Sequence, residues 1–308
     1  CLLGLFALIV YGYQPNAWHF PVRGDVHFID VGQGDAALIR TPTGKHLLVD
    51  GGGRLSFYKE EDEWRQRQDP FDIGKDVLVP LLKERGVHQL DYVLLSHADT
   101  DHVGGLVEVV KSVPVKRIFI NGTVKPNAAM QAFIQAALER KIPIYTASAG
   151  QKVDVDRYTS LSVLHPIATE GLYNEENQNE QSLVFMLNLF NARVLFTGDL
   201  EKEQESELIA QLKQLGIEHG STNKDQEAHP LILKAGHHGS NTSTSAEWLD
   251  YWKPEAAVIS AGRNNLYGHP HDAVLQRLNQ LGSQIYRTDK HGEIQLQITA
   301  HEVAIRTK

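Results

Sequence analysis

The chain has 308 residues, and its densest group of potential metal ligands lies at positions 97 to 102. His97, Asp99, Asp101 and His102 follow the apolar run Tyr92 to Leu95, which is typical of a buried strand. On the loop after this strand, His97 and Asp99 can face one cation, and Asp101 and His102 can face a second. Capping of the next helix, for which Asp101 is suited, needs one such residue and does not explain four. The spacing therefore predicts a metal site that holds two divalent ions.

Two later motifs place further ligands after predicted strands. Asp199 follows the strand Val194 to Thr197, where its carboxylate can bridge two cations, although a Gly-Asp pair is also common in turns. His237 and His238 follow the strand Leu231 to Leu233. Adjacent side chains on an extended chain point to opposite sides, so we assign His237 to the metal and expect His238 to meet the substrate. The alternative is an exposed histidine pair that belongs to no site.

Two other polar clusters contain residues that can contribute to a site. The segment Asp30 to Asp35 contains two glycines between predicted strands, and these suit a tight turn with available backbone N–H groups. The segment Tyr267 to His271 precedes a predicted helix, and its His269 can donate a proton to a phosphate oxygen or a leaving group. Turn geometry and helix capping explain both clusters equally well.

The elements that must position these residues alternate between strands and helices, which predicts sheets covered by helices. A charged insertion that contains aromatic residues, Arg54 to Asp72, is expected to be a surface loop. The predicted strands are Val26 to Val31, Ala36 to Ile39, His46 to Val49, Tyr92 to Leu95, Arg117 to Asn121, Ile144 to Thr146, Leu161 to Leu164, Ser182 to Leu189, Val194 to Thr197, Leu231 to Leu233, Ala257 to Ser260 and Gln284 to Tyr286. The predicted helices are Ile73 to Arg85, Asp101 to Val110, Asn127 to Lys141, Glu201 to Leu215, Ser245 to Trp252 and Pro270 to Leu281, and Glu293 to Ile305 is expected to form a hairpin.

The composition, with 42% hydrophobic and 22% charged residues, is that of a globular protein with a packed core. Its net charge of -8 is atypical of a general nucleic-acid binder, which usually carries a basic face. A DNA-processing function would need positive charge from metal ions and from a local basic rim. Because Cys1 is the one cysteine, the sequence excludes an intrachain disulfide and a zinc site built from several thiolates. The residues expected to form the basic rim are Arg263, Lys234, Arg287 and Lys290.

The N-terminal segment differs in character from the rest of the chain. Cys1 to Tyr13 is almost wholly apolar, and no charged residue precedes Arg23. A membrane-spanning helix needs roughly 20 apolar residues, so we expect residues 1–13 to be the end of such a helix. The alternative is a buried strand or helix of a soluble fold. Residues 14–24 contain two prolines and a glycine and are expected to be a linker, which leaves residues 25–308 as one domain.

Taken together, these motifs resemble those of the metallo-β-lactamase superfamily, in which a His-x-His-x-Asp-His loop, a later bridging aspartate and a last histidine motif hold the metal. Their order is also similar to that in the C-terminal domain of the ComEC family, the DNA-uptake channels of naturally competent bacteria. This narrower resemblance covers the chain from about Val26 to the C-terminus. It is carried by Asp30-Val31-Gly32-Gln33-Gly34-Asp35, Asp50-Gly51-Gly52, His97-x-Asp99-x-Asp101-His102, Thr197-Gly198-Asp199, His237-His238-Gly239-Ser240 and Tyr267-Gly268-His269-Pro270.

The sequence departs from the usual superfamily pattern in two places. Asp99 stands where the loop normally has its second histidine, a substitution that the ComEC family shares. The histidine normally found between the loop and the bridging aspartate has no clear match, and Asn179, Ser182 and His165 are candidates to replace it. Because oxygen ligands favour harder cations, Mn²⁺ fits this ligand set at least as well as Zn²⁺.

The resemblance implies an α/β (α+β) fold for the metallo-β-lactamase-like hydrolase domain 25–308, namely an αββα four-layer sandwich. It also implies two divalent ions, Mn²⁺ or Zn²⁺, that polarise a phosphodiester and lower the pKa of a water molecule. The implied metal ligands are His97, Asp99, Asp101, His102, Asp199 and His237. The implied catalytic residues, which act at the phosphoryl oxygens and the leaving group, are Asp101, His238, Ser240 and His269.

The ComEC resemblance further implies a nuclease that degrades the DNA strand that does not enter the cell. The expected partners are single-stranded DNA at the membrane and the membrane channel region of the same polypeptide, and the isolated domain is expected to be a monomer. The expected location is the inner (cytoplasmic) membrane, with the domain on the extracytoplasmic, periplasmic side. Two alternatives stay open: a hydrolase of a lactone, a β-lactam or a small phosphodiester, and a non-catalytic module that guides DNA.

Overall fold

The computed structural model describes residues 22–53, 70–168, 172–217 and 229–308. The predicted membrane segment 1–13 and most of the predicted surface loop Arg54 to Asp72 lie outside these ranges. Among the described helices, none has both the length and the apolar character needed to cross a membrane. The predicted linker ends before Gly24, because this glycine is the first residue of strand β1 (Gly24–Phe28).

Two large sheets form the centre of the described structure. Both contain antiparallel pairs and parallel pairs. The spatial order in the first sheet is β17 (Val303–Thr307), β16 (Ile294–Ile298), β1, β2 (Ala37–Arg40), β3 (His46–Val49), β4 (Tyr92–Leu94), β5 (Ile118–Ile120) and β7 (Ile144–Thr146). The order in the second sheet is β15 (Gln284–Arg287), β14 (Ala256–Ile259), β13 (Leu231–Lys234), β12 (Ala192–Phe196), β11 (Val184–Leu189), β9 (Thr159–His165) and β8 (Lys152–Asp156).

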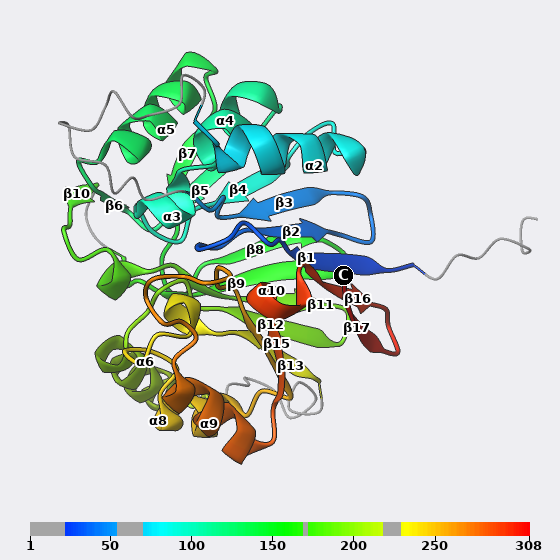
Figure 1. Ribbon diagram of the computed structural model, residues 1–308, viewed down its shortest axis with the longest axis vertical. Coiled ribbons are helices and arrows are strands. Elements are labelled where there is room, and N and C mark those ends of the chain that lie inside the picture. Colours follow the sequence, from blue (N-terminus) through cyan, green and yellow to red (C-terminus); the bar gives the residue numbers. More distant parts are fainter. Residues whose placement is uncertain (1–21, 54–69, 169–171, 218–228) are drawn as a thin grey trace, which may run out of the picture.

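Helices cover the outer face of each sheet, so the described structure has four layers, as Figure 1 shows. This arrangement confirms the predicted αββα sandwich. The first sheet is covered by a π-helix (Gly74–Leu78), α2 (Val79–Glu84), α3 (Thr100–Val103), α4 (Leu106–Ser112) and α5 (Ala128–Glu139). The second sheet is covered by α6 (Lys202–Gln214), α8 (Ala246–Trp252) and α9 (Asp272–Leu281).

Alternation of side chains along the strands builds the core between the layers. In β3, Leu48 packs against the helices, whereas Leu47 and Val49 pack between the two sheets. In β12, Leu195 packs toward the helices on the other side, and its neighbours Val194 and Phe196 pack between the sheets. A strand buried on both faces has no polar face, which explains why these strands are continuous apolar runs in the sequence.

The parallel strands of both sheets end toward the same region of the molecule. β3 pairs with β4 in parallel, and so do β12 with β13 and β13 with β14. The loops that follow these strands carry every predicted metal ligand. Parallel strands place their carboxyl ends at one edge of a sheet, where binding sites of α/β proteins commonly form.

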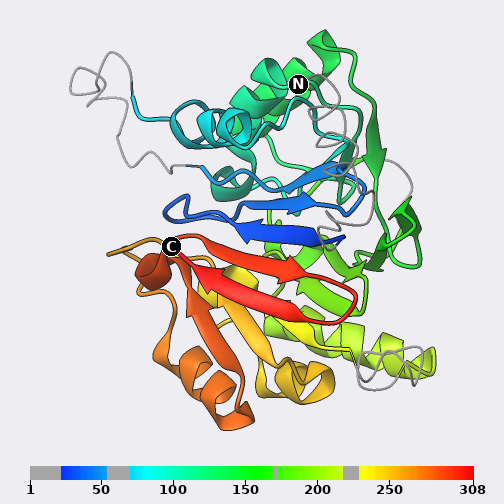
Figure 2. The same ribbon diagram turned by 90° about the vertical axis from the view of Figure 1, so that its right-hand side faces the viewer.

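The C-terminal hairpin completes the first sheet beside its first strand. β16 pairs with β1, and Figure 2 shows the red hairpin next to the blue strand. Glu293, just before β16, accepts a hydrogen bond from the guanidinium of Arg85 and lies 2.8 Å from Nδ1 of His27 in β1. This buried network connects the last strands to the first strand and to the helical layer.

Several predicted boundaries are corrected by the structure. The predicted helix Asp101 to Val110 is two short helices, α3 and α4, because Gly104 and Gly105 lie against the loop after β3. At Gly105 an added Cβ would lie 2.1 Å from the carbonyl oxygen of Gly51, so this approach needs glycine. The edge strand β8 was not predicted, although its sequence alternates valine with charged residues. The paired strands β6 (Thr123–Val124) and β10 (Tyr173–Asn174) were also not predicted.

Candidate metal centre

Four imidazoles converge on the carboxylate of Asp199, which follows β12. Oδ2 of Asp199 lies 3.9 Å from Nε2 of His97, 3.7 Å from Nε2 of His237 and 3.5 Å from Nε2 of His238. Oδ1 of Asp199 lies 3.3 Å from Nε2 of His102. The histidines come from the loops after β4 and β13, so both sheets contribute to the cluster. The structure therefore brings together side chains that are far apart in the sequence.

The unpaired atoms of this cluster fit a bound cation. Nε2 of His97, Nε2 of His102 and Oδ1 of Asp199 are buried, and none has an aligned hydrogen-bond partner among the described residues. Each such buried atom costs about 1–3 kcal/mol, which a coordinated metal ion would offset. Asp35, His102, Asp199 and His238 offer ligand atoms within 4.8 Å of one another. The cluster is suited to binding divalent metal ions.

The carboxylate of Asp50 orients His102 within the cluster. Oδ2 of Asp50 lies 3.0 Å from Nδ1 of His102, and the same carboxylate accepts hydrogen bonds from the backbone N–H and the hydroxyl of Ser96. With Nδ1 bonded to Asp50, Nε2 of His102 is left to face Asp199. The sequence places Asp50 at a strand end, but nothing in its spacing predicts this contact with His102.

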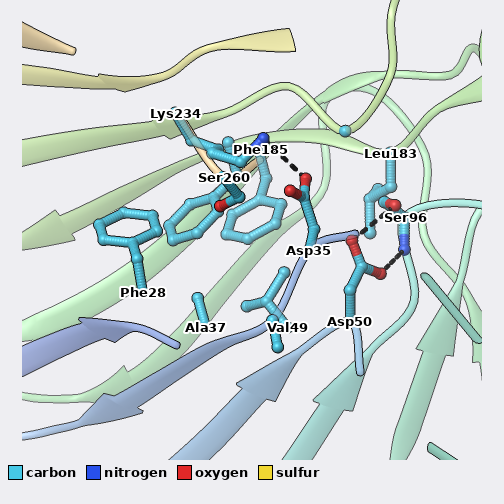
Figure 3. Close-up of a pocket in the computed structure, with 13 residues that line it drawn as sticks. Phe28, Asp35, Ala37, Val49, Asp50, Ser96, Leu183, Phe185, Lys234 and Ser260 are labelled. Atoms are coloured by element: carbon cyan, nitrogen blue, oxygen red, sulfur yellow. Dashed lines mark hydrogen bonds and ion pairs between the residues drawn. The ribbon is translucent and has the colours of Figure 1, made fainter. Parts of the chain in front are cut away.

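Asp35 and Lys234 support the cluster from inside the protein. Nζ of Lys234 lies 2.7 Å from Oδ2 of Asp35, and Oδ1 of Asp35 lies 3.2 Å from Nδ1 of His238. Figure 3 shows the ion pair and the contact between Asp50 and Ser96 in the space between the sheets. The cavity there measures only about 10 Å³, which is too small for a substrate. Lys234 therefore holds Asp35 beside His238, and neither side chain reaches a substrate from this cavity.

The predicted basic rim is wrong at Lys234. The Lys234 side chain is 3% exposed and paired with Asp35, so it cannot lie on a surface rim. Arg287 donates two hydrogen bonds to the carboxylate of Asp289. Arg263 donates to a backbone oxygen of the same residue. The basic side chain that lines the site is instead Lys125, which the sequence did not single out.

The backbone of the two adjacent histidines differs from the extended chain on which we assigned His237 to the metal and His238 to the substrate. His237 has φ 48° and His238 has φ 54°, so both adopt the left-handed conformation and not an extended one. Left-handed residues other than glycine are uncommon, and two in succession are held here by surrounding contacts. Because the chain turns at this point, both Nε2 atoms face Asp199. Both histidines are therefore candidate ligands, and His238 lies in the more compact group.

The two aspartates of the 97–102 loop have different surroundings. Oδ2 of Asp101, in α3, lies 3.2 Å from Nε2 of His238. Oδ2 of Asp99 lies 3.8 Å from Nε2 of His97, while its Oδ1 accepts a hydrogen bond of 2.7 Å from Lys125. Asp101 thus belongs to the cluster, and Asp99 lies between the cluster and a lysine.

The three candidates for the missing ligand each make other contacts. Nδ1 of His165 lies 2.9 Å from the carbonyl oxygen of Ser182, and the Ser182 hydroxyl accepts from the backbone N–H of Asp199. The amide of Asn179 donates weakly to Glu201. Asp35, which the sequence assigned to a turn, instead places an oxygen within the compact ligand group. Asp35 is far from the other ligands in the sequence, so residue spacing could not identify it as a ligand.

The remaining two predicted catalytic residues, Ser240 and His269, have different surroundings. The Ser240 hydroxyl is bonded to Thr242 within the turn after the histidine pair. The His269 ring centroid lies 5.8 Å from that of His237 and 6.5 Å from that of His238. Burial and the imidazoles of His237 and His238 lower the pKa of His269 to about 4. His269 is therefore neutral at pH 7.

Interactions between the imidazoles and the carboxylates shift the pKa values of the cluster. Burial lowers the pKa of His238, but the carboxylates of Asp199, Asp35 and Asp101 outweigh burial and raise it to about 10. The pKa of His102 is also raised well above its usual value, because Asp199 and Asp50 outweigh burial. In the opposite direction, the imidazoles of His238 and His102 outweigh burial and lower the pKa of Asp101 to about 2.

An open cavity of about 300 Å³ gives access to the cluster. Its volume is at the lower end of the range for small-ligand pockets, roughly 300–1,000 Å³. Among the described residues that line it, Lys125 is the one lysine or arginine. The lining residues are Gln33, Asp99, Thr100, Asp101, Lys125, Asn127, Asp199, His237, His238, Tyr267 and His269.

The sequence of the chain matches a known protein family over most of its length. The profile of the metallo-β-lactamase superfamily matches residues 29–263, which is more than half of the chain. The chain belongs to the metallo-β-lactamase superfamily. The matched range contains all the residues of the cluster around Asp199. A solved structure of a CmlA beta-hydroxylase mutant covers 89% of this chain and 54% of its own with a TM-score of 0.52, and at 11% identity it shows the fold alone.

Among proteins of the superfamily, the chain is similar to two competence proteins. It is 34% identical to ComE operon protein 3 of Bacillus subtilis (strain 168) over 96% of this chain and 35% of the relative. It is 31% identical to Competence protein ComA of Neisseria gonorrhoeae over 86% of this chain and 31% of the relative. These similarities confirm the resemblance to the ComEC family. The chain spans about a third of the length of these relatives.

Proposed function

We propose that this domain is a metal-dependent phosphodiesterase that cleaves single-stranded DNA, namely the strand that is not transported during natural transformation. The observation that carries this proposal is the convergence of four imidazoles on Asp199 at the floor of an open cavity. The similarity to competence proteins favours DNA over other substrates of the superfamily. A lactone or a β-lactam offers no phosphate for Lys125 to bind.

The ligands of two divalent ions, Mn²⁺ or Zn²⁺, would come from the two histidine motifs and the aspartates between them. Bound there, the ions would polarise the phosphoryl oxygens and lower the pKa of water at the site. Asp35 and His238 join the predicted set because their ligand atoms lie within the compact group. The proposed ligands are therefore Asp35, His97, Asp99, Asp101, His102, Asp199, His237 and His238.

Lys125 is proposed to bind a non-bridging oxygen of the substrate phosphate. Its side chain is 33% exposed, and its Nζ already donates to a carboxylate oxygen of Asp99 at the cavity wall. A lysine placed beside a phosphate provides charge-assisted hydrogen bonds. Together with the bound metal ions, this lysine would offset the negative charge of the chain, which is -8 in total, where the anionic strand binds.

His269 is proposed to donate a hydrogen bond to the leaving oxygen. Its pKa of about 4 keeps the ring neutral at pH 7, with one N–H to donate. The ring lines the cavity beside His237 and His238. A neutral imidazole near the reacting phosphate can stabilise the leaving group by a hydrogen bond without adding a full charge.

Incubation of the chain with a labelled single-stranded oligonucleotide, with Mn²⁺ or Zn²⁺, tests the proposed function. We expect cleavage that EDTA abolishes and that Asp199→Ala reduces on the order of 100-fold. Asp154→Ala, an exposed carboxylate on β8 far from the cluster in the fold, is the matched control and should cleave at the unchanged rate. Cleavage that persists in both EDTA and Asp199→Ala would show that another site is responsible.

The whole-protein setting is also a proposal. In the curated relatives, about two thirds of the length lies outside the matched region, which leaves room for a membrane channel region in the same polypeptide. We place the domain at the inner membrane, on the extracytoplasmic side, where incoming DNA would reach it first, and as a monomer in isolation. Protease accessibility of the domain in spheroplasts tests the side of the membrane.

A further inference from the structure

The loop after β14 holds two large hydrophobic side chains that are exposed to solvent, and one of them, Tyr267, lines the cavity. Leu266 is 85% exposed and Tyr267 is 45% exposed. Single exposed apolar residues are common on protein surfaces, but adjacent ones beside a polar cavity often mark a contact site. Tyr267 and His269 both line the cavity, and their rings contrast with the three aspartate side chains that also line it.

The side chain of Asn265 fixes the conformation of this loop. Its Oδ1 accepts hydrogen bonds from the backbone N–H groups of Tyr267 and His269, at 3.2 and 3.0 Å. Its Nδ2 donates to the carbonyl oxygens of Gly262 and His269, at 2.8 and 2.6 Å. A loop held by four hydrogen bonds presents Tyr267 in a defined position, which lowers the entropic cost of binding through this ring.

The Tyr267 ring continues a series of rings that starts at the cluster. The His269 ring lies 6.5 Å from the His238 ring with 30° between their planes. The Tyr267 ring lies 5.8 Å from the His269 ring with 27° between their planes. A substrate phosphate at the cluster would therefore have an exposed aromatic ring beyond His269, where a base of the strand could lie rather than the phosphate itself.

We propose that Tyr267 is a specificity-determining residue that stacks on an unpaired nucleobase next to the cleaved phosphate. This inference rests on the proposed nuclease function and deepens it. An unpaired base has a free aromatic face for such stacking, whereas bases in a duplex are already stacked on one another. The ring thus selects single strands without reading their sequence, and Lys125 holds the backbone.

The test compares two single-stranded oligomers with the same sugar-phosphate backbone. One carries thymine on every unit, and the other is built from abasic tetrahydrofuran units. With Mn²⁺ present, we expect Tyr267→Ala to lower kcat/KM on the thymine strand about tenfold and to leave cleavage of the abasic strand unchanged. Tyr267→Phe should retain the wild-type preference, because it keeps the ring. Leu266→Ala is the matched control from the same loop, with no expected effect on either strand.

Other results would overturn the proposal. An equal loss on both strands, or no loss on either, would show that Tyr267 does not contact a base. If either of these results came with weaker cosedimentation of Leu266→Ala and Tyr267→Ala with phosphatidylglycerol vesicles, the loop would be a membrane contact. If the wild-type chain cleaves neither strand, the proposed function fails. The dissociation constants of the two strands then decide this inference, since Tyr267→Ala should weaken only the thymine strand.

Discussion

Oδ2 of Asp50 lies 3.0 Å from Nδ1 of His102, although the two residues are 52 positions apart in the sequence. Asp50 directly follows the strand β3, and His102 lies in α3 after the neighbouring strand β4. The contact sets the tautomer of the imidazole and directs its other nitrogen to Asp199. A carboxylate behind a ligating histidine is a recurrent feature of metal sites because it fixes the ring and raises its basicity.

Replacement of this carboxylate should weaken metal binding without removing a ligand. We expect Asp50→Asn to lower the affinity for Mn²⁺ or Zn²⁺ by about 10–100-fold, because the amide cannot hold His102 in one tautomer. Isothermal titration of the metal into both proteins measures the change. The exposed variant Asp154→Asn is the matched control. An unchanged affinity in Asp50→Asn would show that His102 needs no orientation from Asp50.

The buried ion pair of Lys234 and Asp35 predicts a large loss of stability when one partner is removed. Both side chains are under 10% exposed, and Lys234→Met leaves a buried carboxylate without its cation. We expect the free energy of unfolding to fall by about 3–5 kcal/mol in urea. The double variant Lys234→Met/Asp35→Asn should be less destabilised than Lys234→Met alone. Equal losses in the single and double variants would contradict an energetic role of the pair.

The raised pKa of His238 predicts that metal binding depends on pH. In the metal-free domain this pKa is about 10, so the imidazole is protonated at pH 7 and must lose its proton to coordinate a cation. Affinity should therefore rise with pH between 6 and 9, by about tenfold per unit for each proton released. Titrations in buffers of different ionisation enthalpy count the protons. Affinity that is flat over this range would mean that His238 is neutral before the metal binds.

The lowered pKa of Glu293 predicts that the free energy of unfolding depends on pH. Burial raises its pKa, but the contacts with His27 and Arg85 outweigh burial and lower it from 4.5 to about 2. A carboxyl group whose pKa is lower in the folded state stabilises the fold above its unfolded pKa and loses this effect as the pH falls. Glu293→Gln should therefore lower the free energy of unfolding by about 1–3 kcal/mol at pH 7.

Thermal unfolding of both proteins between pH 7 and pH 2 checks this prediction. The difference between them should shrink as the pH falls from about 4.5 toward 2, because the glutamate becomes protonated like its amide analogue. Glu302→Gln, an exposed residue of the same hairpin, serves as the control. A difference that stays constant across this range would indicate a loss of packing and not of charge.

The four-layer architecture was predicted from the resemblance to the superfamily, whereas the residue pattern itself predicted strands, helices and most of the cluster. Apolar runs that end in Asp or His identified the loops after β4, β12 and β13, because a buried strand exposes its chemistry only at its end. The contacts that orient the ligands were not predictable. Asp50, Asp35 and Lys125 lie beside the cluster only because the packing of the chain brings them there.

Two errors share a physical origin. The prediction for His237 and His238 assumed an extended backbone, but the chain turns there with positive φ at both residues. The prediction for Lys234 assumed that a charged residue at a strand end reaches solvent. In the fold, a carboxylate from the opposite sheet lies beside it. Local sequence carries no information on either feature, since both depend on what lies across the interior.

Three phenylalanines between the sheets fix the relative position of the two sheets that carry the ligands. Phe196 stacks on Phe28 of the first sheet at 5.7 Å and on Phe185 at 4.8 Å, and Phe28, Phe185 and Phe196 all line the small cavity beside Asp35. His97 and His102 are carried by one sheet, while Asp199 and the histidine pair are carried by the other. A slide of one sheet over the other would separate the nitrogens from the carboxylate. The stacked phenylalanines therefore resist such a slide and keep the ligands from the two sheets aligned with one another.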